Sequence, residues 1–188
     1  MIYYGHVLFD FFSMQNILSK AEKIKLVIFD VDGVLTDGGL ILGEDGNEYK
    51  IFNVKDGHGM VMLQNTGCKI AVITARTSKI VADRMTALGI EFVYQGQNDK
   101  GNTVKKLLDK LEVTREQTAY VGDDFIDLPA MRQTGLSIAV ADAHPRVIEL
   151  ADWTTSAAGG HGAAREVCEL IMRSQGTLEK QIQQYLQD

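Results

Sequence analysis

Short apolar runs recur along the chain and alternate with amphipathic segments that have a helical period. The apolar runs are bounded by polar residues, which is typical of buried strands, and they cover residues 26–29, 70–73, 92–94, 119–121 and 137–140. The helical patterns cover roughly residues 60–65, 79–88, 103–111, 126–133, 146–150 and 163–173. Strands that alternate with helices predict an α/β fold in three layers, a Rossmann-like parallel sheet with helices on both faces.

The segment between Gly38 and Asp56 interrupts this alternation. Two short runs, residues 40–42 and 48–52, flank the polar residues 43–47, which is the pattern of a β-hairpin. The hairpin would lie beside the first strand as a small flap, and it is too short to form a separate cap domain. The chain contains only two prolines and no low-complexity stretch, so we expect no linker between domains.

The length and the charge of the chain limit its class. With 188 residues it suits one domain with a core of ordinary size, and its 45% hydrophobic and 23% charged residues are ordinary for a globular protein. The formal net charge of −6 argues against nonspecific binding to nucleic acid. An anionic substrate would be repelled by this net negative charge, so its binding site would need local positive charge.

The cysteines and the start of the chain indicate a compartment. Cys68 and Cys168 lie far apart and form no metal-ligand pair, so we expect two buried thiols. The apolar residues 1–12 lack a basic n-region, contain Asp10 and are too short to span a bilayer. They are either an arm that packs on another subunit or an extended start upstream of Met14. We expect a cytoplasmic protein that makes no membrane contact.

Two carboxylates directly follow the first predicted strand. Asp30 and Asp32 stand two positions apart, and Gly33 follows them. The carboxyl end of such a strand faces the crevice where open α/β sheets bind ligands. Like charges at close range raise each other's pKa unless a cation offsets them. This stretch therefore predicts a divalent metal site that takes part in catalysis.

Two structural alternatives exist for this stretch. A calcium loop between two helices needs an oxygen ligand at its fifth position and glycine at its sixth. Val34 and Leu35 occupy those positions, which excludes such a loop. A plain Asp-Gly turn is the other alternative, and only the rest of the chain argues against it.

Further polar residues follow or precede later elements of the predicted fold. Thr74 follows the strand at residues 70–73, Lys100 precedes the helical pattern at 103–111, and the strand at 119–121 is followed by Asp123, Asp124 and Asp127. Alone, each is weak evidence, because capping explains a lone threonine or acid and a lone lysine is usually a surface charge. Together they supply carboxylates that can bind a metal, and a hydroxyl and a cation that can bind phosphate. Phosphoryl transfer needs this set of groups.

These features resemble the signature of the haloacid dehalogenase superfamily of phosphotransferases. Its D-x-D-x-[TV] motif matches residues 30–34, and its later motifs match Thr74, Lys100, and Asp123 and Asp124 with Asp127. Within the superfamily, the most similar branch dephosphorylates 3-deoxy-D-manno-octulosonate 8-phosphate in lipopolysaccharide precursor synthesis; the matching segments are residues 30–38, 52–57, 94–97, 119–124, 139–143 and 160–166. The resemblance implies a phosphatase domain over residues 22–176, an N-terminal arm over 1–21 and a C-terminal tail over 177–188.

The resemblance also implies a mechanism. Asp30 would attack phosphorus and form an aspartyl-phosphate, and Asp32 would act first as general acid and then as general base. Mg²⁺ would be held by the carboxylate of Asp30, the backbone carbonyl of Asp32 and the carboxylate of Asp123. Thr74 and Lys100 would hold the phosphate oxygens. Asp127 and Asp124 would not contact the phosphate but would orient Lys100 or a water molecule bound to the metal.

Substrate contacts follow from the same resemblance. The implied sugar-binding segment closes the flap over the cleft and consists of Asn53, Val54, Lys55, Asp56 and Gly57. Arg76 and Arg84 match substrate-contacting positions of the family, beside Asp32 and Lys100, and a planar guanidinium suits the carboxylate of a sugar acid. A surface ion pair is the alternative for Arg84. His58 either lines the cleft or is a turn histidine. The implied assembly is a homotetramer, in which a neighbouring subunit supplies the missing wall of the cleft.

The sequence also bears on other functions. Residues 159–165 lack the third glycine of a dinucleotide motif and come late in the chain, so we expect a loop that opens the last helix. A receiver-type signalling domain places its paired acids first, and a catalytically idle scaffold would lack one of the motif residues. A phosphatase for a nine-carbon, sialic-acid-like 9-phosphate stays open, because one fold serves many substrates.

Overall fold

The computed structural model describes residues 14–44 and 46–186, and its centre is a parallel sheet. Within these residues the sheet has six strands in the order β5-β4-β1-β6-β7-β8. They are β1 (Leu26–Phe29), β4 (Lys69–Ile73), β5 (Phe92–Tyr94), β6 (Thr118–Gly122), β7 (Leu136–Ala139) and β8 (Trp153–Thr154). The central strand β1 pairs in parallel with β4 and with β6. The predicted parallel α/β sheet is confirmed.

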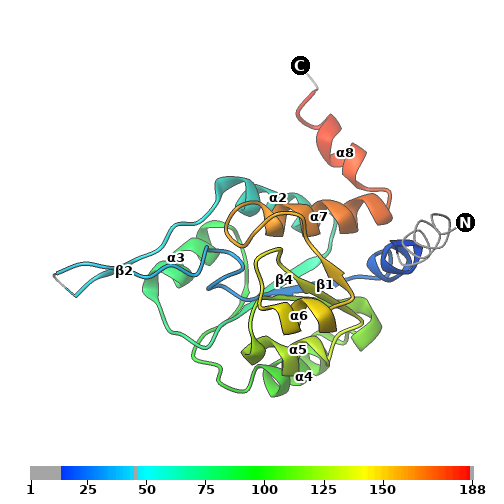
Figure 1. Ribbon diagram of the computed structural model, residues 1–188. Coiled ribbons are helices and arrows are strands. Elements are labelled where there is room, and N and C mark those ends of the chain that lie inside the picture. The colour runs from blue at the N-terminus through cyan, green and yellow to red at the C-terminus, as the bar shows by residue number, and fades with distance from the viewer. Residues whose placement is uncertain (1–13, 45, 187–188) are drawn as a thin grey trace, which may run out of the picture.

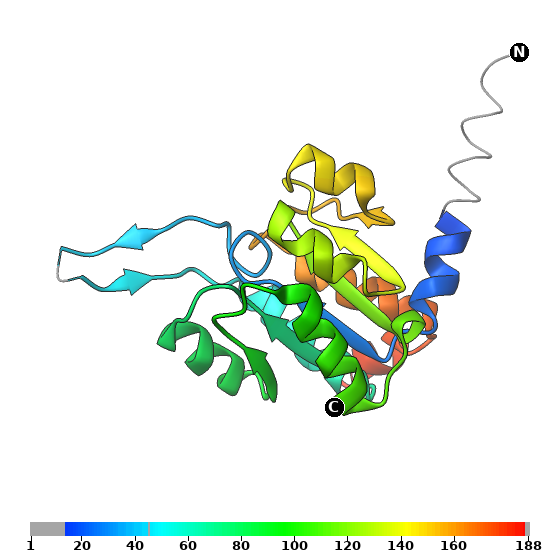
Figure 2. The ribbon, with the colours of Figure 1, turned by 90° about the horizontal axis from the view of Figure 1, so that it is seen from below.

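Helices cover both faces of this sheet (Figure 1). On one face lie α2 (Val54–Gln64), α3 (Lys79–Ala87) and α7 (Ala163–Ser174); on the other lie α4 (Lys100–Leu111), α5 (Leu128–Met131) and α6 (Pro145–Leu150). Figure 2 shows the second group in front of the sheet and α7 behind it. All four residues of β1 are fully buried, because both faces are covered, and this explains their unbroken apolar sequence.

The strand order places a ligand site at β1. The chain runs outward from β1 to β4 and β5, then returns across β1 to β6, β7 and β8. The connections on the two sides of β1 therefore leave the sheet in opposite directions, which opens a crevice at the carboxyl end of β1. Asp30 is the first residue after that end.

The predicted hairpin is present and projects from the body of the protein (Figures 1 and 2). Its strands β2 (Ile41–Leu42) and β3 (Glu48–Tyr49) pair antiparallel. Large apolar side chains on it are exposed: Leu40, Ile41, Leu42, Tyr49 and Ile51. No separate cap domain occurs in the described residues, in agreement with the sequence prediction.

Several helix boundaries differ from those predicted. Helix α2 begins at Val54, not at residue 60, because the side chain of Asn53 accepts a hydrogen bond from Lys55 N at 2.8 Å and caps the helix. Residues 54–57, predicted to close over the cleft as part of a flap, are therefore the first turn of a helix. Helix α4 begins at Lys100, where Asp99 is the capping residue. The pattern at residues 126–133 is divided into a 3₁₀ turn, η2 (Phe125–Asp127), and α5.

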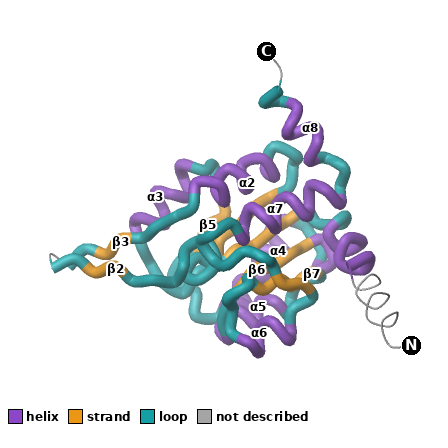
Figure 3. Tube along the Cα trace, turned by 45° about the horizontal axis from the view of Figure 1, so that its top comes forward, coloured by secondary structure: helices purple, strands orange, loops and turns teal. Residues whose placement is uncertain are grey.

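Both ends of the described chain bury residues against the domain, and the C-terminal helix then extends away from its body (Figure 3). Residues 14–21 of the predicted arm are helical, and Ile17 and Ala21 are buried in the core; residues 1–12, predicted to be an arm or an extended start, lie outside the described residues. In the predicted tail, α8 (Leu178–Gln183) buries Leu178. No described helix combines the length and the apolar character needed to cross a membrane.

Candidate active site

A buried lysine lies between two carboxylates at the carboxyl end of β1. Lys100 Nζ is 2.9 Å from Asp30 Oδ2 and 2.7 Å from Asp127 Oδ1. Tyr120 donates its hydroxyl proton to Asp127 Oδ1 at 2.7 Å. All three charged side chains are at least 95% buried, so solvent screens their interactions little. Burial alone would lower the pKa of Lys100, but the charges of Asp30 and Asp127 outweigh it and raise that pKa.

The loop after β6 adds the paired acids. Asp127 Oδ2 accepts hydrogen bonds from the backbone N–H groups of Asp123 at 3.0 Å and Asp124 at 3.3 Å, which fixes the loop. A Cβ on Gly122 would lie 2.5 Å from Cβ of Asp127, so only glycine fits there. The side chain of Asp124 caps the turn η2 at Phe125 N instead of joining the buried cluster.

The carboxylates of Asp30, Asp123 and Asp127 fit a divalent metal ion. Within the described residues, one oxygen of each lies within 4.8 Å of the others. The buried oxygen Oδ1 of Asp123 finds no hydrogen-bond partner in the described part of the chain. Burial first, and then the charge of Asp127, raise the pKa of Asp30 to about 7 and that of Asp123 to about 8. A cation would satisfy the unpaired oxygen and offset this repulsion, and carboxylate oxygens are the ligands that Mg²⁺ prefers.

Asp32 has cationic partners instead of carboxylate neighbours. Its carboxylate forms an ion pair with Lys50, and its Oδ2 is 3.9 Å from Arg76 Nε. Lys50 also lies 3.0 Å from Glu48 Oε1, and Glu48 pairs with Arg76. The side chain of Lys50 is only 1% exposed. This ion-pair network joins the hairpin to the active site and occupies Arg76, one of the two arginines predicted to capture substrate.

The other predicted phosphate and substrate residues lie around this cluster. Thr74 is buried at the end of β4, beside β1, and its hydroxyl accepts from Arg76 N at 3.3 Å. Arg84, on α3, is half-buried against Gly57, where a Cβ would lie 2.3 Å from its Nη2. In the described part of the chain Arg84 makes no ion pair, and its neighbour Asp83 pairs with Lys79 at 2.6 Å.

The predicted sugar-binding segment is divided by its helical conformation. Val54 and Lys55 are exposed on the first turn of α2. Asp56 points inward and is only 2% exposed; its two carboxylate oxygens accept from Gly162 N at 3.2 Å and Arg165 N at 2.8 Å. Asp56 thus caps α7. Its side chain contacts the backbone of that helix, whereas the sequence predicted that it would contact the substrate.

His58 does not belong to the buried cluster. It is exposed on α2, and its ring lies 5.4 Å from the ring of Tyr185 beyond α8. Both cysteines are buried free thiols, as predicted.

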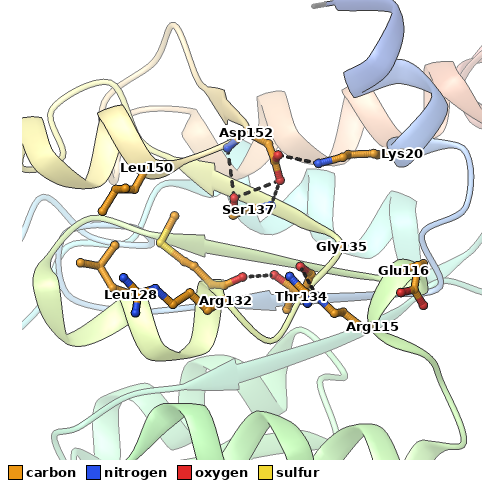
Figure 4. Close-up of a pocket in the computed structure, with 11 residues that line it drawn as sticks. Lys20, Arg115, Glu116, Leu128, Arg132, Thr134, Gly135, Ser137, Leu150 and Asp152 are labelled. Atoms are coloured by element: carbon orange, nitrogen blue, oxygen red, sulfur yellow. Dashed lines mark hydrogen bonds and ion pairs between the residues drawn. The ribbon is translucent and has the colours of Figure 1, made fainter.

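The site does not coincide with the hollow shown in Figure 4. That hollow, of about 440 Å³, lies at the amino ends of β6 and β7 and is lined by residues such as Arg115, Ser137 and Asp152. Because the ligand crevice of an open parallel sheet lies at the carboxyl ends of its strands, this hollow lies at the opposite end of the sheet from that crevice.

Comparison with known proteins decides the family. A model of the haloacid dehalogenase-like hydrolases matches residues 86–167. The 3-deoxy-D-manno-octulosonate 8-phosphate phosphatase KdsC of Escherichia coli strain K12 is 50% identical over 165 residues, 88% of each chain. The crystal structure of the phosphatase of that name from Yersinia pestis has 48% identity and a TM-score of 0.86, over 87% of this chain and 89% of that one. The chain belongs to this phosphatase family. The resemblance predicted from the sequence is confirmed.

A third member of the family has been solved with ligands. The crystal structure of the phosphatase from Moraxella catarrhalis is a complex with a magnesium ion, a phosphate ion and a KDO molecule. It is 41% identical, has a TM-score of 0.90 and covers 92% of this chain and 99% of that one.

Sequence reasoning missed three residues of the phosphatase site. The sequence pattern accounts for Tyr120 only as part of a strand, and for Glu48 and Lys50 only as part of a hairpin. The hairpin offered a usable signal, because residues 48 and 50 are two positions apart and side chains with that spacing share one face of a strand. The same signal was absent for Tyr120, whose partner Asp127 is brought to it by the turn η2.

Proposed function

We propose that this protein is a Mg²⁺-dependent phosphatase that hydrolyses 3-deoxy-D-manno-octulosonate 8-phosphate to the free sugar acid and inorganic phosphate. The reaction would serve lipopolysaccharide precursor synthesis in the cytoplasm. The observation that carries the proposal is the buried group formed by Asp30, Lys100, Asp123 and Asp127, in a member of this phosphatase family.

Asp30 is the nucleophile in this proposal. Its carboxylate attacks phosphorus, forms an aspartyl-phosphate and releases the sugar, and water then hydrolyses the intermediate. Lys100, held 2.9 Å away, compensates the negative charge of attacking and leaving oxygens. Asp127 holds Lys100 in that position through its own 2.7 Å contact. Thr74 contributes a hydroxyl for another phosphate oxygen.

The metal would be held by the carboxylates of Asp30 and Asp123 and by the backbone carbonyl of Asp32. When bound, Mg²⁺ neutralises charge between an anionic nucleophile and an anionic substrate and orients the phosphate. Its presence in the complex of the Moraxella catarrhalis relative supports this assignment. Asp127 faces the same group, but two contacts, to Lys100 and Tyr120, already use its Oδ1.

Asp32 would donate a proton to the leaving sugar oxygen and then accept one from the hydrolytic water. It lies within the same loop as Asp30 but pairs with Lys50, so its environment differs from that of the nucleophile. Two carboxylates in different environments can take different roles in one reaction.

The sugar-acid end of the substrate would be bound by arginine. The half-buried Arg84 has no ionic partner among the described residues, and Arg76 is paired with an exchangeable surface acid, Glu48. A substrate carboxylate would displace Glu48 from Arg76 and form a charge-assisted pair in its place. The exposed first turn of α2, which follows Asn53, would lie beside the sugar hydroxyls.

Turnover assays with paired substrates test this proposal. We expect a higher kcat/KM for 3-deoxy-octulosonate 8-phosphate than for a nine-carbon sialic-acid-like 9-phosphate or a sugar phosphate without a carboxylate. Arg76→Ala and Arg84→Ala should each lower kcat/KM for the carboxylate-bearing substrate by roughly tenfold to a hundredfold, mainly through KM.

Arg146→Ala is the matched control, because Arg146 is an exposed arginine paired with Glu149 on α6. It should leave both substrates unaffected. Equal losses on substrates with and without a carboxylate in the Arg76 and Arg84 variants would refute the assigned role of the arginines. Preference for the nine-carbon phosphate would refute the assigned substrate.

A further inference from the structure

We propose that Asp56 and Asp142 hold residues 159–162, called here the clamp loop, against residues 33–37, called here the catalytic loop, and so position the metal-binding carboxylates. The inference rests on the proposed function for the identity of the reacting groups. The contacts themselves depend on no assumption about the substrate.

Asp56 fixes one end of the clamp loop. It lies on α2, almost fully buried, and accepts from the backbone N–H groups of Gly162 at 3.2 Å and Arg165 at 2.8 Å. The first N–H groups of a helix have no partner within the helix, so a buried carboxylate here satisfies two of them and anchors the start of α7. No oxygen of this carboxylate remains without a hydrogen bond.

Asp142 fixes the other end of the clamp loop. Its Oδ1 accepts from Gly159 N at 2.8 Å. Asn53, the capping residue of α2, adds a third tie by donating from its side-chain amide to Gly160 O at 3.3 Å. The loop is therefore tied both to α2 and to the segment that follows β7.

The clamp loop touches the catalytic loop backbone to backbone. Gly160 N donates to Val34 O at 2.9 Å. A Cβ on Gly159 would lie 1.8 Å from Gly33 O, and a Cβ on Gly160 would lie 2.6 Å from Asp37 N. No side chain fits between the two loops, and this explains why two glycines are needed at residues 159 and 160.

The catalytic loop in turn touches a metal-binding carboxylate. Gly33 has a φ of +92°, and a Cβ there would lie 2.2 Å from Asp123 Oδ2. The clamp loop, Gly33 and Asp123 thus form one line of contacts. Movement of Gly33 along this line would change the spacing between Asp30 and Asp123. Catalytic groups tolerate errors of only about 0.5 Å, so this support affects both metal affinity and rate.

Two variants break the clamp from opposite sides. Asp56→Asn places an amide donor against backbone donors, and Gly159→Ala inserts a methyl group between the loops while the Asp56 hydrogen bonds remain. Two control variants carry the same types of substitution, Asp to Asn and Gly to Ala, at the amino ends of the strands. Asp152→Asn changes a carboxylate that accepts from Ser137 N at 2.9 Å (Figure 4), and Gly135→Ala places a Cβ 2.9 Å from Arg115 O.

Three measurements on the full chain compare these variants. Hydrogen exchange of the metal-free protein, followed by mass spectrometry of the peptide covering residues 31–38, reports the catalytic loop. Calorimetric titration with Mg²⁺ reports metal affinity. Kinetics with p-nitrophenyl phosphate give kcat and KM separately.

We expect faster exchange in residues 31–38, and a loss of about tenfold to a hundredfold in Mg²⁺ affinity and in kcat for both clamp variants. KM should change by less than about twofold, because the clamp does not touch the substrate. The controls should lose thermal stability without these changes. If Gly159→Ala does not fold, Asp142→Asn replaces it with the same expectations.

Unchanged exchange in residues 31–38 together with unchanged Mg²⁺ affinity in the clamp variants would overturn the inference. The same losses in the controls would also overturn it, because they would reflect general destabilisation. A wild-type protein that hydrolyses no sugar-acid phosphate would refute the proposed function, whereas the exchange and metal-binding differences would still support the clamp.

Discussion

Asp30 and Asp32 are the same residue type in one loop, but their partners give them different chemistry. Asp30 faces Lys100 and carboxylates, whereas Asp32 pairs with Lys50. We predict that Asp32→Asn lowers kcat on the sugar-acid phosphate by about 10²- to 10⁴-fold, because a sugar alkoxide needs a general acid. The loss with p-nitrophenyl phosphate should be much smaller, because its leaving group needs little protonation. Steady-state kinetics on both substrates provide the measurement.

The control for this prediction is Asp37→Asn. Asp37 is an exposed acid of the same loop, and its side chain accepts a hydrogen bond from the nearby Gly39 N. It should retain near-normal kcat on both substrates. A loss of equal size on the two substrates in Asp32→Asn would rule out Asp32 as the acid.

The burial of Asp30 and Asp123, together with the charge of Asp127, predicts a pH-dependent effect of metal on stability. Their pKa values rise from 3.8 to about 7 and about 8 on folding. The folded, metal-free protein therefore binds protons more tightly than the unfolded chain, and its stability falls as pH rises between those values. Mg²⁺ competes with these protons, so the increase in Tm that it causes should be larger at about pH 8 than at about pH 5.5.

Thermal unfolding with saturating Mg²⁺ or with EDTA, over this pH range, tests the prediction. Asp123→Asn should lose most of the increase at high pH, whereas Asp109→Asn, outside the cluster, should keep it. An increase in Tm that is independent of pH would show that the carboxylates are already ionised without metal.

At the scale of secondary-structure elements, the hairpin is coupled to the active site by charge. Lys50 is the residue that links them, with Asp32 on one side and Glu48 on the other. Burial would lower the pKa of Lys50, but the hydrogen bonds that Lys50 donates to these carboxylates outweigh it and raise that pKa. We predict that Lys50→Ala lowers the free energy of unfolding by roughly 1–3 kcal/mol and also lowers kcat, because two carboxylates lose their partner.

Denaturant unfolding and kinetics of the same preparation measure both effects. Lys79→Ala is the control, since its side chain is 85% exposed in a pair with Asp83 and such pairs contribute about 0.5 kcal/mol or less. Unchanged kcat in Lys50→Ala would show that the hairpin and Asp32 act independently.

At the scale of the whole molecule, the projecting hairpin predicts assembly. Its exposed apolar side chains include Leu42, 71% exposed, and Ile51, 65% exposed. Apolar side chains gathered on an extended arm mark an interaction surface, and the arm is too small to cover the cleft of its own subunit. We predict a homotetramer, in which a neighbouring subunit covers the cleft and excludes water.

Sedimentation velocity and activity together test the assembly. Leu42→Ser combined with Ile51→Ser should dissociate the assembly and lower kcat/KM. Leu150→Ser, an exposed leucine on α6, should leave it intact. A fully active wild-type monomer at assay concentration would contradict this prediction.

The sequence by itself determined the features that depend on local pattern. Four-residue apolar runs are strands because they are buried on both faces, and a carboxylate directly after such a strand must lie at the edge of the sheet where ligands bind. The sequence therefore predicted that one group of residues lies at the carboxyl ends of the strands: Asp30, Asp32, Thr74 and Asp123. The spacing of the motifs that contain them indicated the family. The turn residues 43–47 likewise predicted the hairpin.

Only the tertiary structure decided contacts between residues that are distant in sequence. Asp56 was predicted to face the substrate but caps α7, 106 residues away, because helices α2 and α7 pack side by side. Lys50 reaches Asp32 because the chain returns from the projecting hairpin to the loop that follows β1, and Asn53 begins a helix because its side chain caps it. Periodicity reports which face of an element is buried, but it contains no information on which partner will cover that face, and that choice is made by packing.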